Sequence, residues 1–439
     1  MDDYINIGKK VLKMINNNGF EAYFVGEAVR NFILKREINH VEIVTNANIV
    51  AVKKIFVDCV SIDIDNFAIK LTYGGKEFYI SSYVTLSKVG RKFTNTKVNA
   101  KNINEDLLNR DFTISAIAMT HSGRIIDPFN GYKHLQQKKI RYVGNGKVKF
   151  LLNPSLIIKA FSLMSELDFN FSLKTKRLIL KRKKYLCEKH IIENIEEFKK
   201  IFSGQSAKKA IGMMNATNVD MVLPTFKKAI RLLGSNYKTV SFQDFLMMSF
   251  ILNGKIEKEY ISYIDNYENF VAVYDLVIEN RKNKFDKITL FKYGVDICLE
   301  ANRIKKALRY RSSSSKKISR VYKNLRIKSQ DDLVFNALDI QKIISPKDYR
   351  MVDEILIKVA FAVVNKEIKN TVKDIRKKVV EILIEEKIPY NLEGFKDSQL
   401  SVNGSDQTEE DSNREIKAKQ QVVPTYVDFE DEEVKNEKD

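Results

Sequence analysis

The stretch from Gly19 to Thr45 constrains the fold of this chain most, because it places a strand, a glycine turn, a helix and a second strand in direct succession. Ala22–Val25 is short and apolar, as in a buried strand, and Gly26 permits a tight turn. Apolar residues then recur at helical spacing from Val29 to Ile33. The helix N-terminus offers free backbone N–H groups to an anion, and Arg30 adds a guanidinium. The stretch therefore predicts an α/β unit with a phosphate-binding turn, a unit that many α/β domains contain.

The rest of the N-terminal region continues this mixed pattern. Helical periods cover Tyr4–Asn17 and Ile49–Phe56, and strand-like runs cover Val60–Ile64, Phe67–Tyr73 and Glu77–Val84. The segment Asn104–Met119 predicts one apolar helix with Arg110 and Asp111 near its middle. Taken alone, such a charged pair is more often a salt bridge than a functional site. A turn-rich segment then closes the first unit near Gly146.

From Asn153 to Gly394 strand signals nearly vanish and helical periods dominate. Pro154 suits the first position of a helix. Further helices are predicted at Leu173–Lys184, Ile192–Phe202, Ala207–Met214, Pro224–Leu233, Phe242–Leu252, Ile261–Glu279, Lys287–Lys306, Asp353–Asn365 and Thr371–Glu385. The fold class is therefore α+β, with a small α/β head followed by a helical remainder.

Charge is distributed unevenly along the chain. The net charge is +19, and residues 391–439 hold 14 acidic and 6 basic residues, which leaves +27 for residues 1–390. Such an excess favours a polyanion such as nucleic acid, although an AT-rich genome also enriches lysine. Each cationic run is more often a solvated helix face, but their number favours RNA binding by Lys181, Arg182, Lys183, Lys184, Arg309, Arg311, Lys316 and Lys317.

Several classes of protein are disfavoured. No apolar run approaches the roughly 20 residues that cross a bilayer, and no secretion signal precedes the first helix, so we expect a cytoplasmic protein without membrane contact. Cys59, Cys187 and Cys298 are widely spaced and predict neither a disulfide framework nor a zinc site. The acidic segment after residue 390 is low in apolar residues and is predicted to be disordered.

Several motifs in order carry a resemblance to a known family. FVGEAVRN at 24–31 is similar to FVGGAVRD, HVEIVT at 40–45 stands in the place of DIDIAT, and NRDFTISAIA at 109–118 resembles RRDFTINAMA. The segments DPFNGYKHLQQKKIRYVGN and LNPSLIIKAFSLMSELDFNFS follow further motifs of the same family. Over residues 1–390 the chain resembles the class II tRNA nucleotidyltransferases, the CCA-adding enzymes of the bacterial poly(A) polymerase type.

The resemblance implies a nucleotidyltransferase head at 1–148, a nucleotide-reading neck at 149–235, a tRNA-binding body and tail at 236–390, and an appended acidic segment at 391–439. It implies attack by the 3′ hydroxyl of the tRNA acceptor end on the α-phosphate of CTP or ATP, with Mg²⁺ ions held by clustered carboxylates. It places Glu42 and His40 at the catalytic positions, Glu42 as the metal ligand, and nucleotide contacts at Gly26, Arg30, Arg110, Asp111, Asn153 and Lys159.

The chain departs from the family where the chemistry takes place. His40 and Tyr79 stand at two of the three carboxylate positions, which leaves Glu42. In the neck, Asn153, Leu156, Lys159 and Ser162 stand where the family has Asp and three Arg, and Glu196 stands at another Arg position. Asp63 and Asp65 could form a displaced metal pair, but no glycine turn precedes them.

Two functions follow from this pattern. The first is a tRNA nucleotidyltransferase whose catalysis is weak or lost because metal-site carboxylates are replaced. The second is a tRNA-binding or RNA-binding pseudoenzyme with a regulatory or scaffold role. In both, Mg²⁺ and CTP or ATP are required only if activity remains.

Overall fold

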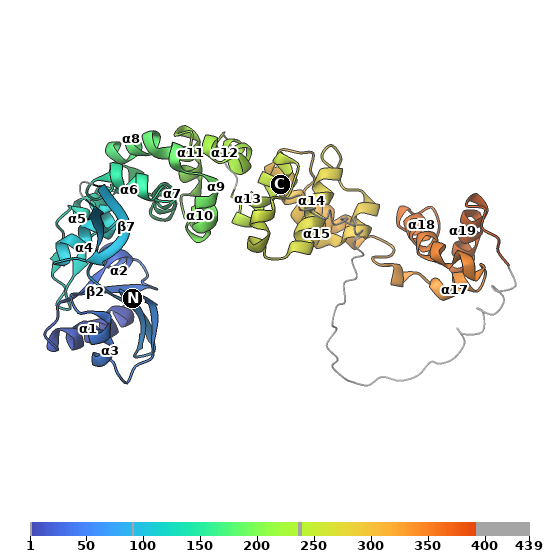
Figure 1. Cartoon of the computed structure of the whole chain (residues 1–439). Coiled ribbons are helices and arrows are strands. Elements are labelled where there is room, and N and C mark those ends of the chain that lie inside the picture. The colour runs from blue at the N-terminus through green and yellow to red at the C-terminus, as the bar shows by residue number, and fades with distance from the viewer. Residues whose placement is uncertain (1, 90–91, 236–238, 392–439) are drawn as a thin grey trace, which may run out of the picture. The chain divides into compact units, whose positions relative to one another are not determined.

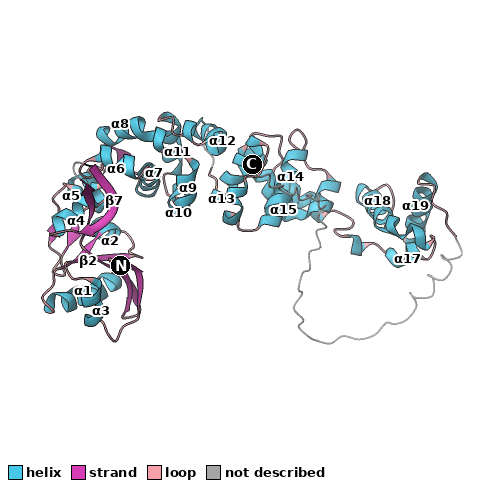
Figure 2. Cartoon of the chain, viewed as in Figure 1, coloured by secondary structure: helices cyan, strands magenta, loops and turns pink. Residues whose placement is uncertain are grey.

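The computed structural model describes residues 2–89, 92–235 and 239–391. The chain divides into two compact units, Met1–Asp332 with Ala360–Lys369, and Leu333–Val359 with Asn370–Asp439. Strands are concentrated in the N-terminal part, and helices make up most of the remainder (Figure 1, Figure 2). This confirms the predicted α+β class. The predicted boundaries at 148 and 235 lie inside the first unit, and the acidic segment from residue 392 on lies outside the described residues.

The head is built on a seven-stranded sheet with the order β3-β4-β5-β2-β1-β8-β9. The β2–β5 pair is parallel and the other neighbours are antiparallel. The strands are β1 (Ala22–Val25), β2 (Val41–Thr45), β3 (Ser61–Asp65), β4 (Ala68–Tyr73), β5 (Lys76–Ser82), β8 (Ala118–Met119) and β9 (Ile125–Ile126). The helices α1 (Asp2–Asn17), α2 (Gly26–Ile33) and α3 (Ile49–Ile55) confirm the helices predicted in this region.

The segment 104–119 differs from its prediction as one helix. Helix α4 (Ile103–Asn109) ends before Arg110, which has extended backbone angles (φ −63°, ψ 153°). The backbone of Asp111 and Thr113 instead pairs with the chain at 141–143, through Val143 N to Asp111 O at 3.1 Å and Thr113 N to Arg141 O at 2.8 Å. These tertiary hydrogen bonds outweigh the local helical period, and a short 3₁₀ turn, η1 (Thr113–Ser115), follows.

β6 (Val84–Val89) and β7 (Lys92–Asn99) pair as an antiparallel hairpin. The sequence did not predict this hairpin, because the predicted strand at Glu77–Val84 included only the first residue of β6. Two further short strands, β10 (Lys139–Ile140) and β11 (Asn170–Phe171), pair in parallel. They pair the end of the head with the chain that follows the helix at Leu156–Leu167.

Helices make up most of the remainder, as predicted. In the first unit they are α5 (Gly131–Gln136), α6 (Gly146–Leu152), α7 (Leu156–Leu167), α8 (Leu173–Arg182), α9 (Glu188–Glu193), α10 (Ile195–Ser203), α11 (Ala207–Ala216), α12 (Pro224–Ser235), α13 (Phe242–Asn253), α14 (Tyr267–Glu279), α15 (Lys287–Ala307) and α16 (Ser315–Lys323). The helix predicted at 192–202 is interrupted at Asn194, whose backbone is not helical. Helix α16 was not predicted.

Towards the C-terminus, α17 (Ala337–Gln341), α18 (Val352–Asn365) and α19 (Val372–Glu385) follow, and the last two were predicted. Among the described helices, no single one is long and apolar enough to cross a membrane, and only the bent pair α6 and α7, with 106° between them, meets the length and composition criteria together. Most of α7 is buried in the protein core.

Candidate functional site

Gly26 marks the turn between β1 and α2 and lies directly against two charged side chains. Its φ of +71° is in the left-handed region, and a Cβ at this position would lie 2.8 Å from Glu42 Oε2 and 3.2 Å from Arg110 Nη1. Glycine is therefore required both for the backbone conformation and for the close approach. The structure thus brings together three residues that the sequence placed in one site.

Glu42 on β2 lies between the guanidinium of Arg110 and the imidazole of His40. Arg110 Nη1 donates a hydrogen bond to Glu42 Oε2 at 2.5 Å, and His40 Nε2 lies 3.7 Å from Oε1. Burial alone would raise the pKa of Glu42, but the contacts with His40 and Arg110 outweigh it and lower the pKa to about 2. Glu42 is therefore an ionised carboxylate that the protein itself neutralises.

Asp106 is a member of this cluster that the sequence reasoning missed. It is 3% exposed, accepts a hydrogen bond from Val84 N at 3.0 Å, and lies 3.6 Å from Arg110 Nε. Burial raises the pKa of Asp106 in spite of Arg110. An acid four residues before Arg110 was a visible signal, but it would have suggested a pair on the surface of a helix.

Tyr79 is the residue that the family resemblance aligned with a third carboxylate position. Tyr79 on β5 is the register partner of Glu42, and its ring lies 4.4 Å from the ring of His40 between centroids. Among His40, Glu42 and Tyr79, only Glu42 has a carboxylate.

This donor set does not fit a pair of Mg²⁺ ions, which prefer several carboxylate oxygens in one place. Within residues 2–89, 92–235 and 239–391, no group of three or more His, Cys, Asp or Glu is arranged to hold a metal ion. Asp63 and Asp65 lie on β3, which β4 and β5 separate from β2, and they pair with Lys53 and Lys97.

Asp111 does not join the cluster around Glu42. It contacts the neck. Its carboxylate accepts a hydrogen bond from Lys159 Nζ on α7 at 2.7 Å. Burial tends to lower the pKa of Lys159, but the neighbouring Asp111 outweighs it and raises that pKa. Lys149 Nζ donates hydrogen bonds to the carbonyls of Leu108 at 2.8 Å and Arg110 at 2.5 Å, at the end of α4. Burial lowers the pKa of Lys149 to about 8.

Arg30 is buried and connects the head to the neck. Its side chain is 3% exposed, and Nη2 lies 2.6 Å from Glu166 Oε1 on α7 and 3.4 Å from Glu27 Oε1. Burial raises the pKa of Glu166 although Arg30 acts in the opposite direction. The structure thus places Arg30 in an ion pair across 136 residues of sequence, where the prediction expected a phosphate contact.

The remaining neck positions are also engaged within the protein. Asn153 ends α6 and its side chain accepts a hydrogen bond from Ser155 N at 3.1 Å. Ser162 donates to Glu197 at 2.8 Å, and Glu196 pairs with Lys199 at 2.8 Å. At these positions the side chains of Asn153, Ser162 and Glu196 contact other residues of the 149–235 region.

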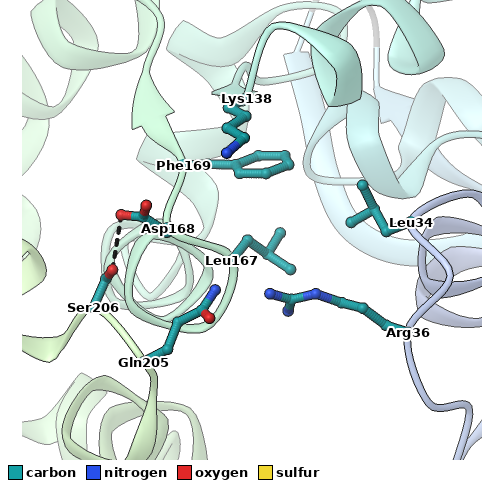
Figure 3. Close-up of a pocket in the computed structure, with 8 residues that line it drawn as sticks. All are labelled: Leu34, Arg36, Lys138, Leu167, Asp168, Phe169, Gln205 and Ser206. Atoms are coloured by element: carbon teal, nitrogen blue, oxygen red, sulfur yellow. Dashed lines mark hydrogen bonds between the residues drawn. The ribbon is translucent and has the colours of Figure 1, made fainter.

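A pocket of about 480 Å³ lies beside this junction (Figure 3). Arg36 Nη1 and Gln205 Nε2 both donate to the carbonyl of Glu166 at 3.1 Å. Asp168 accepts a hydrogen bond from Ser206 at 2.7 Å, and Phe169 contributes an apolar wall. None of the predicted site residues lines this pocket.

The predicted RNA-binding residues fall in two places. In the first, Lys181 and Lys184 are exposed, Arg182 stacks on Tyr185, and Lys183 donates to the carbonyls of Thr217 and Asn218 at 2.8 and 3.2 Å. Lys183 therefore caps the end of α11. In the second, the exposed side chains are Arg309 and Arg311 in the turn after α15 and Lys316 and Lys317 in the first turn of α16.

Known proteins resemble the chain over most of its length. Residues 22–141 match the Poly A polymerase head domain, and residues 255–379 match a putative tRNA nucleotidyltransferase domain 2. A CCA-adding enzyme of Ligilactobacillus salivarius (strain UCC118) is 30% identical over 86% of this chain and 96% of its own length. One from Bacillus cytotoxicus is 28% identical over 83% and 96%.

Solved structures share the fold. The Bacillus stearothermophilus CCA-adding enzyme in complex with CTP aligns with a TM-score of 0.69 and 23% identity over 88% of this chain and 99% of its own. The Thermotoga maritima CCA-adding enzyme complexed with tRNA_CCA aligns with a TM-score of 0.59 and 19% identity over 87% and 96%.

Proposed function

Because the chain belongs to the class II tRNA nucleotidyltransferases, the family of the CCA-adding enzymes, we propose that it binds the 3′ acceptor end of tRNA in the cytoplasm, with nucleotidyl transfer weak or lost. Relatives that are 28–30% identical over nearly their whole length support a shared substrate class. One structural neighbour is complexed with tRNA and another with CTP, which supports the same partners for this chain.

The observation that carries this proposal is the ion pair between Arg110 and Glu42 at 2.5 Å. A metal-dependent transferase needs several carboxylates that converge on its ions. Here the single carboxylate at those positions already has a guanidinium as counter-ion, and a histidine and a tyrosine occupy the neighbouring positions. A cation that binds Glu42 Oε2 would have to displace Arg110.

Binding of a nucleoside triphosphate is weakened for a related reason. Arg30 and Lys159, which the family resemblance assigned to nucleotide contacts, are paired with Glu166 and Asp111. Glu196 adds a negative charge at a position where the family has arginine. Phosphate binding would therefore require breaking existing ion pairs and would meet repulsion from the neck.

Binding of tRNA does not depend on these residues. Residues 1–390 carry a net charge of +27, and contacts to RNA phosphates supply sequence-independent affinity that falls with salt. Lys181, Lys184, Arg309 and Arg311 are exposed and suited to such contacts. Full loss of catalysis would leave an RNA-binding protein with a regulatory or scaffold role.

A working transferase is the second candidate, and the position of Glu42 favours it. Its side chain is 33% exposed and lies beside Gly26, where the family binds the triphosphate. Incubation with labelled CTP or ATP and a tRNA that lacks CCA separates the two functions. We expect little or no incorporation, and robust addition that Glu42→Ala abolishes would overturn the proposed loss of catalysis.

A further inference from the structure

A second pocket, of about 710 Å³, lies within the first compact unit, where the body follows the neck. Its walls come from α9, from the first residues of α12, and from residues 253–260, which run from the end of α13 into the 3₁₀ helix η4 (Lys258–Tyr263). Asn253 Nδ2 donates a hydrogen bond to the carbonyl of Thr225 at 2.8 Å and so joins the end of α13 to the start of α12. No residue predicted to bind nucleotide, metal or RNA lines this pocket, so the proposed function does not explain it.

Tyr260 lines the pocket and has a buried hydroxyl group without a hydrogen-bond partner. The residue is 1% exposed, and within the described ranges its hydroxyl oxygen makes no hydrogen bond. The ring packs against Phe226 and Phe250, with 5.2 and 6.3 Å between ring centroids, which fixes the position of the hydroxyl. Burial raises the pKa of Tyr260, and the charges of Glu188 and Glu259 raise it further, so the hydroxyl is neutral. Because buried polar groups in folded proteins are nearly always paired, this hydroxyl indicates a partner other than the described residues.

The charged side chains of the pocket leave an excess of negative charge. Its two lysines, Lys255 and Lys189, pair with glutamates at 2.9 and 3.8 Å. In the part of the chain that the structure describes, no lysine or arginine nitrogen lies within 4.0 Å of the carboxylates of Glu188 and Glu259, which also line the pocket. Glu188 accepts hydrogen bonds from Thr225 N at 2.6 Å and Thr225 Oγ1 at 2.9 Å, which fix its carboxylate at the start of α12. Two carboxylates without a cationic partner therefore line the same pocket as the unpaired hydroxyl.

We propose that this pocket, here called the Tyr260 pocket, binds an aliphatic diamine, with one ammonium group at Glu188 and the Tyr260 hydroxyl and the other at Glu259. An ammonium group has three N–H donors and no acceptor, and both carboxylate oxygens and a neutral hydroxyl oxygen accept such hydrogen bonds. Ile192 and Pro224 also line the pocket and supply apolar surface for the methylene chain between the two ammonium groups. The ligand therefore matches the pocket in both charge and shape of its polar and apolar parts.

The arrangement of the acids favours an organic cation over a metal ion. Three glutamates line the pocket, but within residues 2–89, 92–235 and 239–391 no group of three or more His, Cys, Asp or Glu is arranged to hold a metal ion. A chain of several carbons can reach carboxylates that do not share one ion. A phosphate or another anion would be repelled by the unpaired carboxylates. The inference concerns a ligand other than tRNA or a nucleotide and so goes beyond the proposed function.

The decisive test is calorimetric titration of the full chain with putrescine, a four-carbon diamine, at physiological salt. We expect saturable binding of one molecule per chain, although the net charge of +19 opposes general uptake of cations. Tyr260→Phe keeps the ring and removes only the hydroxyl. It should weaken binding at least about 10-fold, because a hydrogen bond to a charged group is lost. The free variant should unfold at the same temperature as the wild type or higher, since an unpaired buried hydroxyl has been removed.

A matched pair of charge variants tests the second ammonium position. Glu259 is exposed, and Glu259→Gln should weaken putrescine binding about 2- to 5-fold, as expected for one solvent-exposed ion pair. Glu410→Gln removes the same charge from the acidic segment at 391–439 and should leave the affinity unchanged. Two further ligands test the chemistry of the cation. Butylamine, with one ammonium group, should bind more weakly than putrescine, and tetramethylammonium, which has no N–H donor, should not bind.

Four results would overturn the inference. The first is the absence of saturable binding to the wild type up to millimolar putrescine, and the second is equal affinity in Tyr260→Phe. The third is an equal loss in Glu259→Gln and Glu410→Gln, which would mean that the diamine binds acidic side chains in general. The fourth is binding of an acetylated lysine amide as tight as that of putrescine, which would assign the pocket to a lysine side chain of a protein partner. None of these titrations contains tRNA, so each result is separate from the proposed function.

Discussion

Replacing Glu42 with glutamine tests whether this residue is a partner of Arg110 or a metal ligand. The substitution keeps the size of the side chain and removes its charge. It leaves the Arg110 guanidinium, which is 20% exposed, with Asp106 at 3.6 Å as its remaining acidic neighbour. If the ion pair is a structural element, the folded state loses stability whether or not Mg²⁺ is present.

The free energy of unfolding that Glu42→Gln is expected to lose lies between the contributions measured for exposed and for buried ion pairs. Exposed pairs contribute about 0.2 to 1 kcal/mol, and removing one partner of a buried pair costs about 3 to 5 kcal/mol. The fall in the pKa of Glu42 from 4.5 to about 2 corresponds to at most about 3 kcal/mol. Because the carboxylate is 33% exposed, solvent screening reduces this, and we expect Glu42→Gln to cost about 2 kcal/mol.

The assay is urea unfolding of the wild type, Glu42→Gln, Arg110→Met and the double variant, each with and without millimolar Mg²⁺. We expect the double variant to be less destabilised than the sum of the single variants, since neither charge is then left unpaired. We expect Mg²⁺ to have no effect on any of them. Stabilisation of the wild type by Mg²⁺ that disappears in Glu42→Gln would refute the reasoning, because a ligand stabilises the state that binds it.

The pH dependence gives a second measure of the same pair. The folded pKa of Glu42 is depressed, so its contribution to stability is fully present above the unfolded pKa of about 4.3 and is lost as pH falls toward about 2. The difference in unfolding free energy between wild type and Glu42→Gln should therefore shrink between about pH 4 and pH 2. A difference that stays constant over this range would contradict the pairing.

Three further outcomes follow from the same structure. Arg30→Met should cost about 2 to 4 kcal/mol in urea unfolding, because it leaves Glu166 without the buried cation, whereas no loss would mean that the pair does not join head and neck. Gly26→Ala should cost more than about 1 kcal/mol through its left-handed backbone alone and should displace Glu42, and a neutral effect would contradict the close approach. Deleting residues 391–439 removes a net charge of −8 and should tighten tRNA binding at low salt, whereas unchanged affinity would dismiss masking of the body by that segment.

The sequence predicted those parts of the molecule that local patterns determine. The strand, turn and helix around Gly26 and most of the long helices follow from short-range periodicity and glycine chemistry. The segment 104–119 was predicted wrongly because its backbone pairs with 141–143, an interaction that no local pattern contains. The short alternating runs of β6 and β7 carried too little apolar signal to identify the hairpin.

The structure brings some of the predicted site residues together, but the contacts of their charged groups were not predicted. Gly26, Glu42 and Arg110 come together as the family motifs implied. The partners that decide what the charged groups can do are distant in sequence: Glu166 for Arg30 and Lys159 for Asp111. A single sequence does not show which residues pair over such distances, because each member alone has the pattern of an ordinary charged surface residue.

The ion pair with Arg110 balances the charge of Glu42 within the protein. Carboxylates that converge on a metal repel one another unless the ions neutralise them. Among His40, Glu42 and Tyr79, only Glu42 has a carboxylate, and Arg110 is close enough to balance its charge. The substitution His40→Asp would put a second carboxylate next to Glu42 and leave Arg110 to balance both. We therefore expect His40→Asp to destabilise the head, because one guanidinium would then have to balance two carboxylates.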